Sequence, residues 1–290
     1  MLTLHSENAA RPGRVVVMGA GGFVGQASSR LLKRTGLEVI ALTRKEVDLL
    51  AADAAGRLAS YLTPECTLIV TSAQAPCKDI PMLIANLRMM ETVITAVKSC
   101  RVGHLVYISS DAVYKDSSKP LSEISGAEPA SLHGVMHLTR EVMLKNELPN
   151  VPQVFVRPTL IFGPDDPHNG YGPNRFMRLA HQGQGIVLFG EGEELRDHIF
   201  IEDVADIVRR CVVHRAAGVV NAVTGIVTSF KEIADLAAAR VTPRVLVRGS
   251  PRRGPVPHGG YRAFDSCLLK QAFPDFKPTP LTDGLDRMRG

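Results

Sequence analysis

The chain has 290 residues, a formal charge of +5 at pH 7, 45% hydrophobic residues and only 5% aromatic residues, with no tryptophan. A chain of this length can bury a large core, in one two-lobed unit or in two domains, and the modest, dispersed positive charge gives little support to a nucleic-acid-binding class. The five cysteines include no CxxC pair, which argues against a disulfide framework or a zinc site and favours reduced thiols in a cytoplasm: Cys66, Cys77, Cys100, Cys211 and Cys267.

The N-terminal residues 1–13 lack the apolar stretch of a signal peptide, so we expect a short flexible leader there. No run of about 18 uninterrupted apolar residues occurs in the chain, so we predict no membrane span and no membrane partner. The folded part is expected to begin at residue 14, where the apolar run RVVVMG starts.

From residue 14 onward, short β-rich runs alternate with amphipathic stretches. The pattern predicts strands at 14–19, 37–43, 66–72, 104–110 and 151–158, and helices at 23–36, 80–99 and 131–146. Such alternation is typical of a doubly wound parallel sheet with helices on both faces. We therefore predict an α/β fold with a Rossmann-type dinucleotide-binding domain over residues 14–163.

Beyond residue 163 the sequence changes character. The turn-rich GPDDPHNGYGPN precedes a helical RFMRLAHQG, and residues 186–212 indicate a strand, a turn, a second strand and a helix. We predict that residues 164–290 form mainly a smaller substrate-binding lobe. Within it, the segment from about 199 to 222 is expected to return to the sheet.

A glycine-rich turn follows the first strand. In GAGGFVG, Gly19, Gly22 and Gly25 are spaced as GxxGxxG, and the next helix begins with Phe23 and Val24. Glycines permit a tight turn and a close approach of the backbone to a pyrophosphate, and the N–H groups of a helix N-terminus can bind that phosphate. A glycine triplet between a strand and a helix therefore predicts a dinucleotide site, with a purely structural turn as the alternative.

The end of the second strand bears on which dinucleotide is bound. NAD-binding folds usually place an acid there, which contacts the ribose hydroxyls. In this chain Thr43 is followed by Arg44 and Lys45. A guanidinium could pair with a 2′-phosphate, so the sequence favours NADP, with NAD as the second choice. The alternative is that both basic residues belong to a solvated turn.

At this point the sequence resembles the extended short-chain dehydrogenase/reductase family, specifically its nucleotide-sugar epimerase, dehydratase and reductase members. Besides GAGGFVG, the resemblance rests on LVYISSDAVY, LSEISGAEP, VRPTLIFGP, GEGEELRDHIFIEDVA and the last segment, 261–285. It implies hydride transfer with NAD(P), a nucleotide-diphosphate sugar as substrate, and a homodimer formed through the helices at 80–99 and 131–146.

The same resemblance implies roles for individual residues. Ser110 matches the serine that binds the reacting sugar oxygen, whereas Ser109 is expected to be structural. Candidate cofactor contacts are Asn86, near the nicotinamide, with a helix-packing role as its equal alternative, and Asp48, near the adenine. On the substrate side, Arg196 matches an arginine beside the diphosphate, where the adjacent Asp197 would hold it in place. Further candidates around the diphosphate are Asn174, Arg175 and Arg262.

The family's catalytic motif YxxxK is replaced here. Its tyrosine exchanges a proton with the substrate, and its lysine holds the nicotinamide ribose and lowers the tyrosine pKa. This chain has His133 and His137 at those positions, and the sequence offers no nearby tyrosine as a substitute, since Tyr107 and Tyr114 belong to the serine strand region. The cofactor fold is expected to be intact, and the chemistry altered.

Several interpretations of the two histidines remain open. In the first, His133 is the acid and base near neutral pH and His137 contacts the ribose. In the second, the site binds nucleotide or nucleotide sugar without turnover, as a sensor or interaction subunit. In the third, the pair binds a metal with His168, His181 or His198; in the last, both rings are structural. The first predicts an NAD(P)-dependent epimerase or reductase; dehydration is least favoured, because Asp111 and Ala112 lack the usual acid pair.

Overall fold

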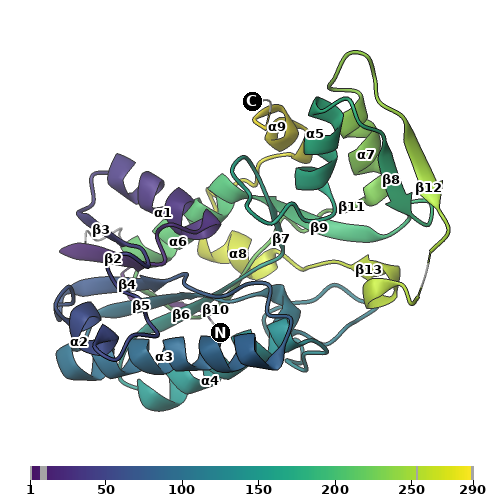
Figure 1. Cartoon of the computed structure of the whole chain (residues 1–290). Coiled ribbons are helices and arrows are strands. Elements are labelled where there is room, and N and C mark those ends of the chain that lie inside the picture. The colour runs from purple at the N-terminus through teal and green to yellow at the C-terminus, as the bar shows by residue number, and fades with distance from the viewer. Residues whose placement is uncertain (1, 7–11, 253, 289–290) are drawn as a thin grey trace.

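The structure is a computed structural model, and it describes residues 2–6, 12–252 and 254–288. Within these residues a central sheet of seven strands runs in the order β1-β10-β6-β5-β4-β2-β3 (Figure 1). The strands are β1 (Thr3–Leu4), β2 (Arg14–Met18), β3 (Val39–Leu42), β4 (Cys66–Val70), β5 (His104–Ile108), β6 (Gln153–Pro158) and β10 (Ala216–Ala222). All neighbours are parallel except β1 and β10.

Helices cover both faces of this sheet, which confirms the predicted doubly wound α/β class. One face carries α2 (Ala54–Ala59), α3 (Ile80–Cys100) and α4 (Leu132–Glu147), and the other carries α1 (Phe23–Arg34), α6 (Ile201–Val213) and α8 (Cys267–Ala272) (Figure 1). Buried aliphatic side chains fill both interfaces. In the sheet, β3 lies on one side of β2 and β4 lies on the other. The direction in which the chain adds strands therefore reverses between β2 and β4. Ligands of such sheets bind outside the strand ends at this reversal.

The N-terminal expectation is wrong for one short stretch. Thr3 and Leu4 form β1, which pairs antiparallel with Ala216 and Ala217 of β10. Leu4 also packs against the buried cluster on that face of the sheet. Residues 3–4 therefore form an edge strand and not the expected flexible leader. Residues 7–11 of that expected leader lie outside the described residues.

The second lobe lies at the end of the sheet where the parallel strands finish (Figure 1). It contains a four-stranded sheet of β7 (Leu160–Phe162), β9 (Leu195–Phe200), β11 (Val227–Ser229) and β13 (Tyr261–Arg262), and a pair formed by β8 (Ile186–Phe189) and β12 (Val247–Ser250). Its helices are α5 (Pro173–His181), α7 (Phe230–Ala238) and α9 (Leu281–Asp286). The segment 199–222 passes from this lobe through α6 into β10, which pairs with β6 in the central sheet.

Helix α3 has a mixed environment. By length and composition alone it is the one helix of the described residues that could cross a membrane, with a mean hydropathy of 1.4 over its best window. Met90, Val93 and Val97 are nevertheless buried against the sheet, whereas Ile80 and Ile84 are exposed. Core helices pass the same test, so its composition is weak evidence for a membrane span.

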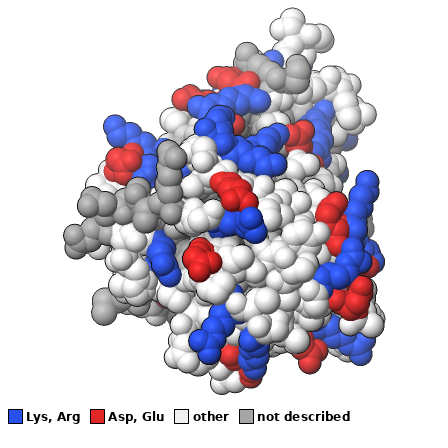
Figure 2. Space-filling model, turned by 90° about the vertical axis from the view of Figure 1, so that its left-hand side faces the viewer, with Lys and Arg blue, Asp and Glu red and all other residues white. Residues whose placement is uncertain are grey.

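Charged side chains on the face shown in Figure 2 are mixed. Lysine and arginine groups lie next to aspartate and glutamate groups over much of this face, with uncharged surface between them, and several basic side chains adjoin one another in the upper part of the view (Figure 2).

Candidate functional site

A cavity of about 590 Å³ lies at the carboxyl ends of the parallel strands, between the two lobes. From the sheet domain it is lined by the glycine turn, the segments after β4 and β5, and the first turns of α4. The second lobe contributes Asp166, His168 and Asn174, and two buried arginines, Arg196 and Arg262. The predicted cofactor and substrate residues therefore meet largely in one place.

The glycine turn is built by close backbone contacts. Gly19 has φ +98°, a conformation that side chains rarely adopt. A Cβ on Gly25 would lie 2.2 Å from the carbonyl oxygen of Gly19, so only glycine lets α1 approach the turn. Gly22 precedes α1 without a side-chain cap, and the first turn of the helix holds no acid. The N-terminal N–H groups of α1, including those of Phe23 and Val24, therefore have no capping side chain or carboxylate in front of them.

Arg44 and Asp48 lie together beyond the end of β3. The Arg44 guanidinium donates to Asp48 at 3.1 Å and is largely exposed, with 78% of its side chain accessible. The pKa of the Asp48 carboxyl is lowered by the Leu50 backbone N–H and by Arg44. An exposed ion pair contributes little to stability, so an incoming phosphate could replace the carboxylate.

Asn86 does not line the cavity, contrary to the expected cofactor contact. It is fully buried on α3, where its side-chain oxygen accepts from the Gln74 N–H and its amide donates to the carbonyl oxygens of Gln74 and Met82. The two hydrogen bonds to Gln74 hold the segment after β4, and Ala73 and Ala75 of that segment do line the cavity. Asn86 thus supports the cavity wall without lining the cavity itself.

Ser110 lies where β5 ends and lines the cavity. Its hydroxyl oxygen accepts from the Ala112 N–H at 3.1 Å and caps the short turn η1 (Asp111–Val113). Helix α4 reaches this turn closely, because a Cβ on Gly134 would lie 2.0 Å from the carbonyl oxygen of Ala112. Ser131 caps α4 by accepting from the Gly134 N–H. His133 lies in this first turn of α4 and is therefore held close to η1 and Ser110.

The His133 ring lines the cavity beside Ser110. Its Nδ1 accepts from the Cys77 N–H at 3.4 Å. Burial lowers the pKa of His133 below 6.5, against the opposing effect of the nearby Asp111 carboxylate. Burial therefore favours the neutral form of the ring, and His133 as the acid and base near neutral pH stays a prediction.

His137 is nearly buried, one helical turn further along α4, and its ring meets the His133 ring edge-on with centroids 4.7 Å apart. Its Nδ1 lies 2.7 Å from the hydroxyl of Tyr107. A tyrosine is therefore adjacent to the histidine pair, which the sequence did not indicate. Burial raises the pKa of Tyr107 to about 12. Burial, with the charges of His133 and Arg140, holds the pKa of His137 well below 6.5.

Ser109, directly after β5 and on the same face as Tyr107, forms a second contact with α4. The hydroxyl of Ser109 donates to Glu141 at 2.6 Å, and Arg157 of β6 donates to the same carboxylate at 2.9 and 2.6 Å. Glu141 is fully buried and Arg157 nearly so. This network, which the sequence did not reveal, ties the strand that carries Ser110 to the helix that carries both histidines.

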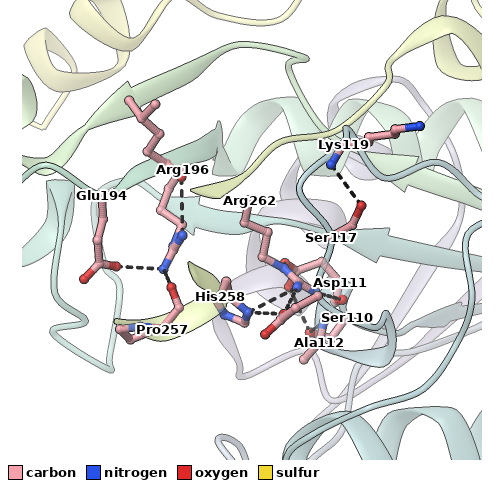
Figure 3. A network of polar contacts seen from close by, with 12 residues as sticks. Ser110, Asp111, Ala112, Ser117, Lys119, Glu194, Arg196, Pro257, His258 and Arg262 are labelled. Atoms are coloured by element: carbon pink, nitrogen blue, oxygen red, sulfur yellow. Dashed lines mark hydrogen bonds and ion pairs between the residues drawn. The ribbon is translucent and has the colours of Figure 1, made fainter. Parts of the chain in front are cut away.

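On the substrate side, Arg196 is held by a different acid from the one expected. Its guanidinium donates to Glu194 at 2.7 Å and to the carbonyl oxygen of Pro257 at 2.9 Å (Figure 3). Asp197 instead accepts from the N–H groups of Thr224 and Gly225, because successive strand residues point to opposite faces. Burial lowers the pKa of Arg196, against the attraction of Glu194.

Arg262 closes the cavity by pairing with the sheet domain. It donates to the Asp111 carboxylate and to Asp116, both at 2.8 Å, and His258 lies 2.5 Å from the same Asp116 oxygen (Figure 3). Asn174 lines the cavity, but its amide is engaged with the Gly163 N–H and the Ile161 carbonyl. Arg175 is exposed on α5 and does not line the cavity.

The proposed metal site gains no support from the described residues, which contain no group of three or more His, Cys, Asp or Glu side chains arranged to hold an ion. His168 lines the cavity, but His198 is buried with both ring nitrogens unpaired. Burial lowers the pKa of His198 to about 3, so that ring is neutral.

Residues 15–225 match the family described as the NAD dependent epimerase/dehydratase family. A dTDP-4-dehydro-6-deoxy-D-allose reductase of Streptomyces bikiniensis is 26% identical, over 94% of each chain. A Thermus thermophilus UDP-glucose 4-epimerase solved with NAD has a TM-score of 0.81 at 21% identity, covering 96% of this chain and 99% of that one. A GDP-L-fucose synthetase of Naegleria fowleri bound to NADP has a TM-score of 0.83 at 16% identity, covering 99% and 95%. At these identities the two structures show the shared fold.

Proposed function

Because the chain belongs to the NAD dependent epimerase/dehydratase family, we propose that it is an NAD(P)-dependent oxidoreductase or epimerase acting on a nucleotide-diphosphate sugar. The observation that carries the proposal is the common cavity, where Ser110, His133 and His137 lie between the glycine turn and two arginines. The names of the similar proteins, a nucleotide-sugar reductase and an epimerase, support the same class.

The glycine turn fits a dinucleotide, because the space that a Cβ on Gly25 would need is taken by backbone, and the N-terminus of α1 has no side-chain cap. Gly19, Gly22 and Gly25, with the N–H groups of Phe23 and Val24, would hold the pyrophosphate. When bound, the nicotinamide supplies or accepts a hydride. We propose NADP as the preferred form, since Arg44 is exposed beyond β3, with Asp48 as its present partner.

The proposed roles at the reacting centre are these. Ser110 orients the substrate oxygen and His133 handles the proton, while His137 contacts the ribose side. Arg196 and Arg262, with Asn174 beside them, would face the diphosphate. Both arginines already have carboxylate partners, so a diphosphate must displace or share them.

Ligand binding tests this proposal first. NADPH at about 100 times its dissociation constant should raise the melting temperature of the protein by on the order of 5 °C, and NADH by less. A nucleotide sugar should add a further shift. If neither dinucleotide changes the melting temperature, the proposal is wrong.

Turnover separates the enzyme from a binding protein. His133→Phe should lower kcat at least about 100-fold while leaving the dissociation constant of NADPH unchanged. If the wild-type protein binds dinucleotide and sugar nucleotide but turns over neither an alcohol nor a ketone form, the catalytically degenerate alternative, a sensor or interaction subunit, is correct instead.

We also propose a homodimer formed through α3 and α4. A groove of about 720 Å³ runs between the outer faces of these helices, lined by Ile84, Leu87, Ile94, Val142 and Met143 among others. Ile84 and Val142 are exposed by 45% and 55%. A matching pair of helices from a second chain would cover these apolar side chains.

Val142→Glu should weaken the dimer at least about 100-fold, because a carboxylate would be buried without a partner. Light scattering after size-exclusion chromatography measures the mass. Val187→Glu, on β8 of the second lobe with 44% exposure, is the matched control and should stay dimeric. A monomeric wild-type protein would contradict the proposal.

We place the protein in the cytoplasm, which the five free cysteines support.

A further inference from the structure

The Cys77 N–H group determines which nitrogen of the His133 ring carries the proton. A backbone N–H can only donate, so Nδ1, which accepts from Cys77 N–H, carries no proton. A neutral ring then has its proton on Nε2. Nε2 makes no hydrogen bond within the described residues, and the ring lines the cavity. His133 therefore offers an N–H group to whatever occupies the cavity.

His137 is fixed in the same form by Tyr107. The phenol is buried, and within the described residues the one acceptor bonded to its hydroxyl is Nδ1 of His137, at 2.7 Å. The Arg140 guanidinium beside the phenol ring can only donate. If Nδ1 carried the proton, the phenol O–H would be buried without an acceptor, which is costly. Tyr107 therefore donates to Nδ1, and His137 keeps its proton on Nε2.

The surroundings keep both rings neutral. His133 lies at the N-terminal end of α4, whose dipole disfavours a cation, and it faces Asp111 of η1 and His168 of the second lobe. His137 faces His133 and Arg140 on α4 and Tyr107 on β5. Asp111, the one carboxylate among these groups, is already paired with Arg262. A neutral imidazole N–H is an established electrophile towards a carbonyl oxygen.

We infer that the Nε2–H groups of His133 and His137 are two hydrogen-bond donors to the reacting oxygen, with His137 there instead of at the ribose, and that the site therefore takes a ketone rather than an alcohol. A carbonyl oxygen only accepts, so it matches two Nε2–H groups. An alcohol must also donate its own proton, but the Ser110 oxygen already accepts from the Ala112 N–H, and Asp111 already accepts from Arg262 and from the Ser110 hydroxyl. The inference rests on the proposed function and specifies it: a reductase of a keto sugar nucleotide.

The reaction then balances as follows. The reduced dinucleotide would supply the hydride for the new carbon–hydrogen bond, while the carbonyl π bond breaks and its electron pair moves to the oxygen. That oxygen takes the proton from Nε2 of His133, and water returns a proton to the same nitrogen, so that the ring ends neutral and not as an imidazolate. The hydroxide that remains takes up a proton from the solvent. The substrate is reduced, the dinucleotide is oxidised, and one solvent proton is consumed.

Nitrogen NMR of ¹⁵N-histidine-labelled protein reads the tautomers without any turnover, with His133→Asn and His137→Asn used for assignment. Both rings should be neutral with the proton on Nε2 at pH 7 and above. An imidazolium at pH 7, or a proton on Nδ1 of either ring, would overturn the inference.

Tyr107→Phe tests the positioning role of the phenol. His137 should become a mixture of tautomers while His133 keeps its proton on Nε2, and kcat should fall about fivefold with the KM of the dinucleotide unchanged. Tyr114→Phe is the matched control, since it also removes a buried phenol hydrogen bond, to Asn221 at 2.7 Å. It should leave both tautomers and kcat unchanged. An unaltered His137 tautomer in Tyr107→Phe would refute the assignment.

The substrate experiment separates the two proposals. With the oxidised dinucleotide bound, a 4-keto sugar nucleotide should bind at least tenfold tighter than its 4-hydroxy counterpart, and kcat for reduction should show no inflection near pH 6.5. Equal binding of the alcohol, or an inflection there, sinks the inference but leaves the proposed function standing. Absence of turnover with either substrate sinks the proposed function, while the NMR result still decides the histidines.

Discussion

Gly25→Ala is expected to abolish dinucleotide binding, because the added Cβ would lie 2.2 Å from the carbonyl oxygen of Gly19 and 2.8 Å from the hydroxyl of Thr71. Neither obstacle can move easily. The Gly19 oxygen is backbone and accepts from the Gly22 N–H, and the Thr71 hydroxyl donates to the carbonyl oxygens of Met18 and Gly19. Helix α1 would have to withdraw from the turn, and its N-terminal N–H groups would withdraw with it.

The effect is measured as the dissociation constant of NADPH, which should rise more than about 100-fold, since a displacement of the donors removes several charge-assisted hydrogen bonds together. Gly56→Ala on α2 is the control, because a Cβ there meets nothing within 4 Å. It should preserve binding and slightly raise the melting temperature. Retained NADPH affinity in Gly25→Ala would show that the turn does not hold the pyrophosphate.

The glycine turn and most elements of the sheet domain could be predicted from the sequence because they depend on nearby residues. The Gly19 to Gly25 contact joins residues six apart, and the strands and helices of the sheet domain are long, periodic segments. The order of the strands in the sheet depends on contacts between distant parts of the chain, and β1 has only two residues, Thr3 and Leu4, so neither could be predicted in this way. Strands such as β12, with the sequence VRGS, form because a partner strand lies beside them, and no local pattern marks them.

In the site, two errors have a geometric cause. Arg196 was expected to pair with its neighbour Asp197, but adjacent strand residues face opposite sides, and the acid two positions away, Glu194, shares its face. The alternation rule could have predicted this pair. Asn86 was placed at the cofactor by analogy, with helix packing as the alternative, and the fold shows that it binds Gln74 of the cavity wall and Met82 of its own helix.

The contacts of Tyr107 with His137 and of Ser109 with Glu141 follow from the strand repeat and the helix repeat together. Tyr107 on β5 and Ser109 directly after it are two residues apart, and their partners His137 and Glu141 are four residues apart on α4. A strand places every second side chain on one face, and a helix places every fourth side chain on one face. The pairs are therefore stacked along one interface, which becomes visible only when that strand and that helix are known to pack together.

Glu141→Gln is expected to lower the free energy of unfolding by about 3–5 kcal/mol, because it leaves the buried Arg157 guanidinium without its carboxylate partner. An amide can still accept one hydrogen bond, but it supplies no negative charge. The second hydrogen bond from Arg157, to Oε2 at 2.6 Å, is lost because that oxygen becomes an NH2 donor. Denaturant unfolding followed by circular dichroism measures the change.

The matched control lies on the same helix. Glu147 pairs with Lys98 on the surface, where the two side chains are 41% and 51% exposed, so Glu147→Gln should lower the free energy of unfolding far less than Glu141→Gln. Comparing the two substitutions separates burial from charge, since both remove one carboxylate from α4. A loss below about 1 kcal/mol for Glu141→Gln would mean that Arg157 finds another partner. In that case packing of α4, through the close approach of Gly134 to Ala112, would have to hold the histidines against the Ser110 turn without this network.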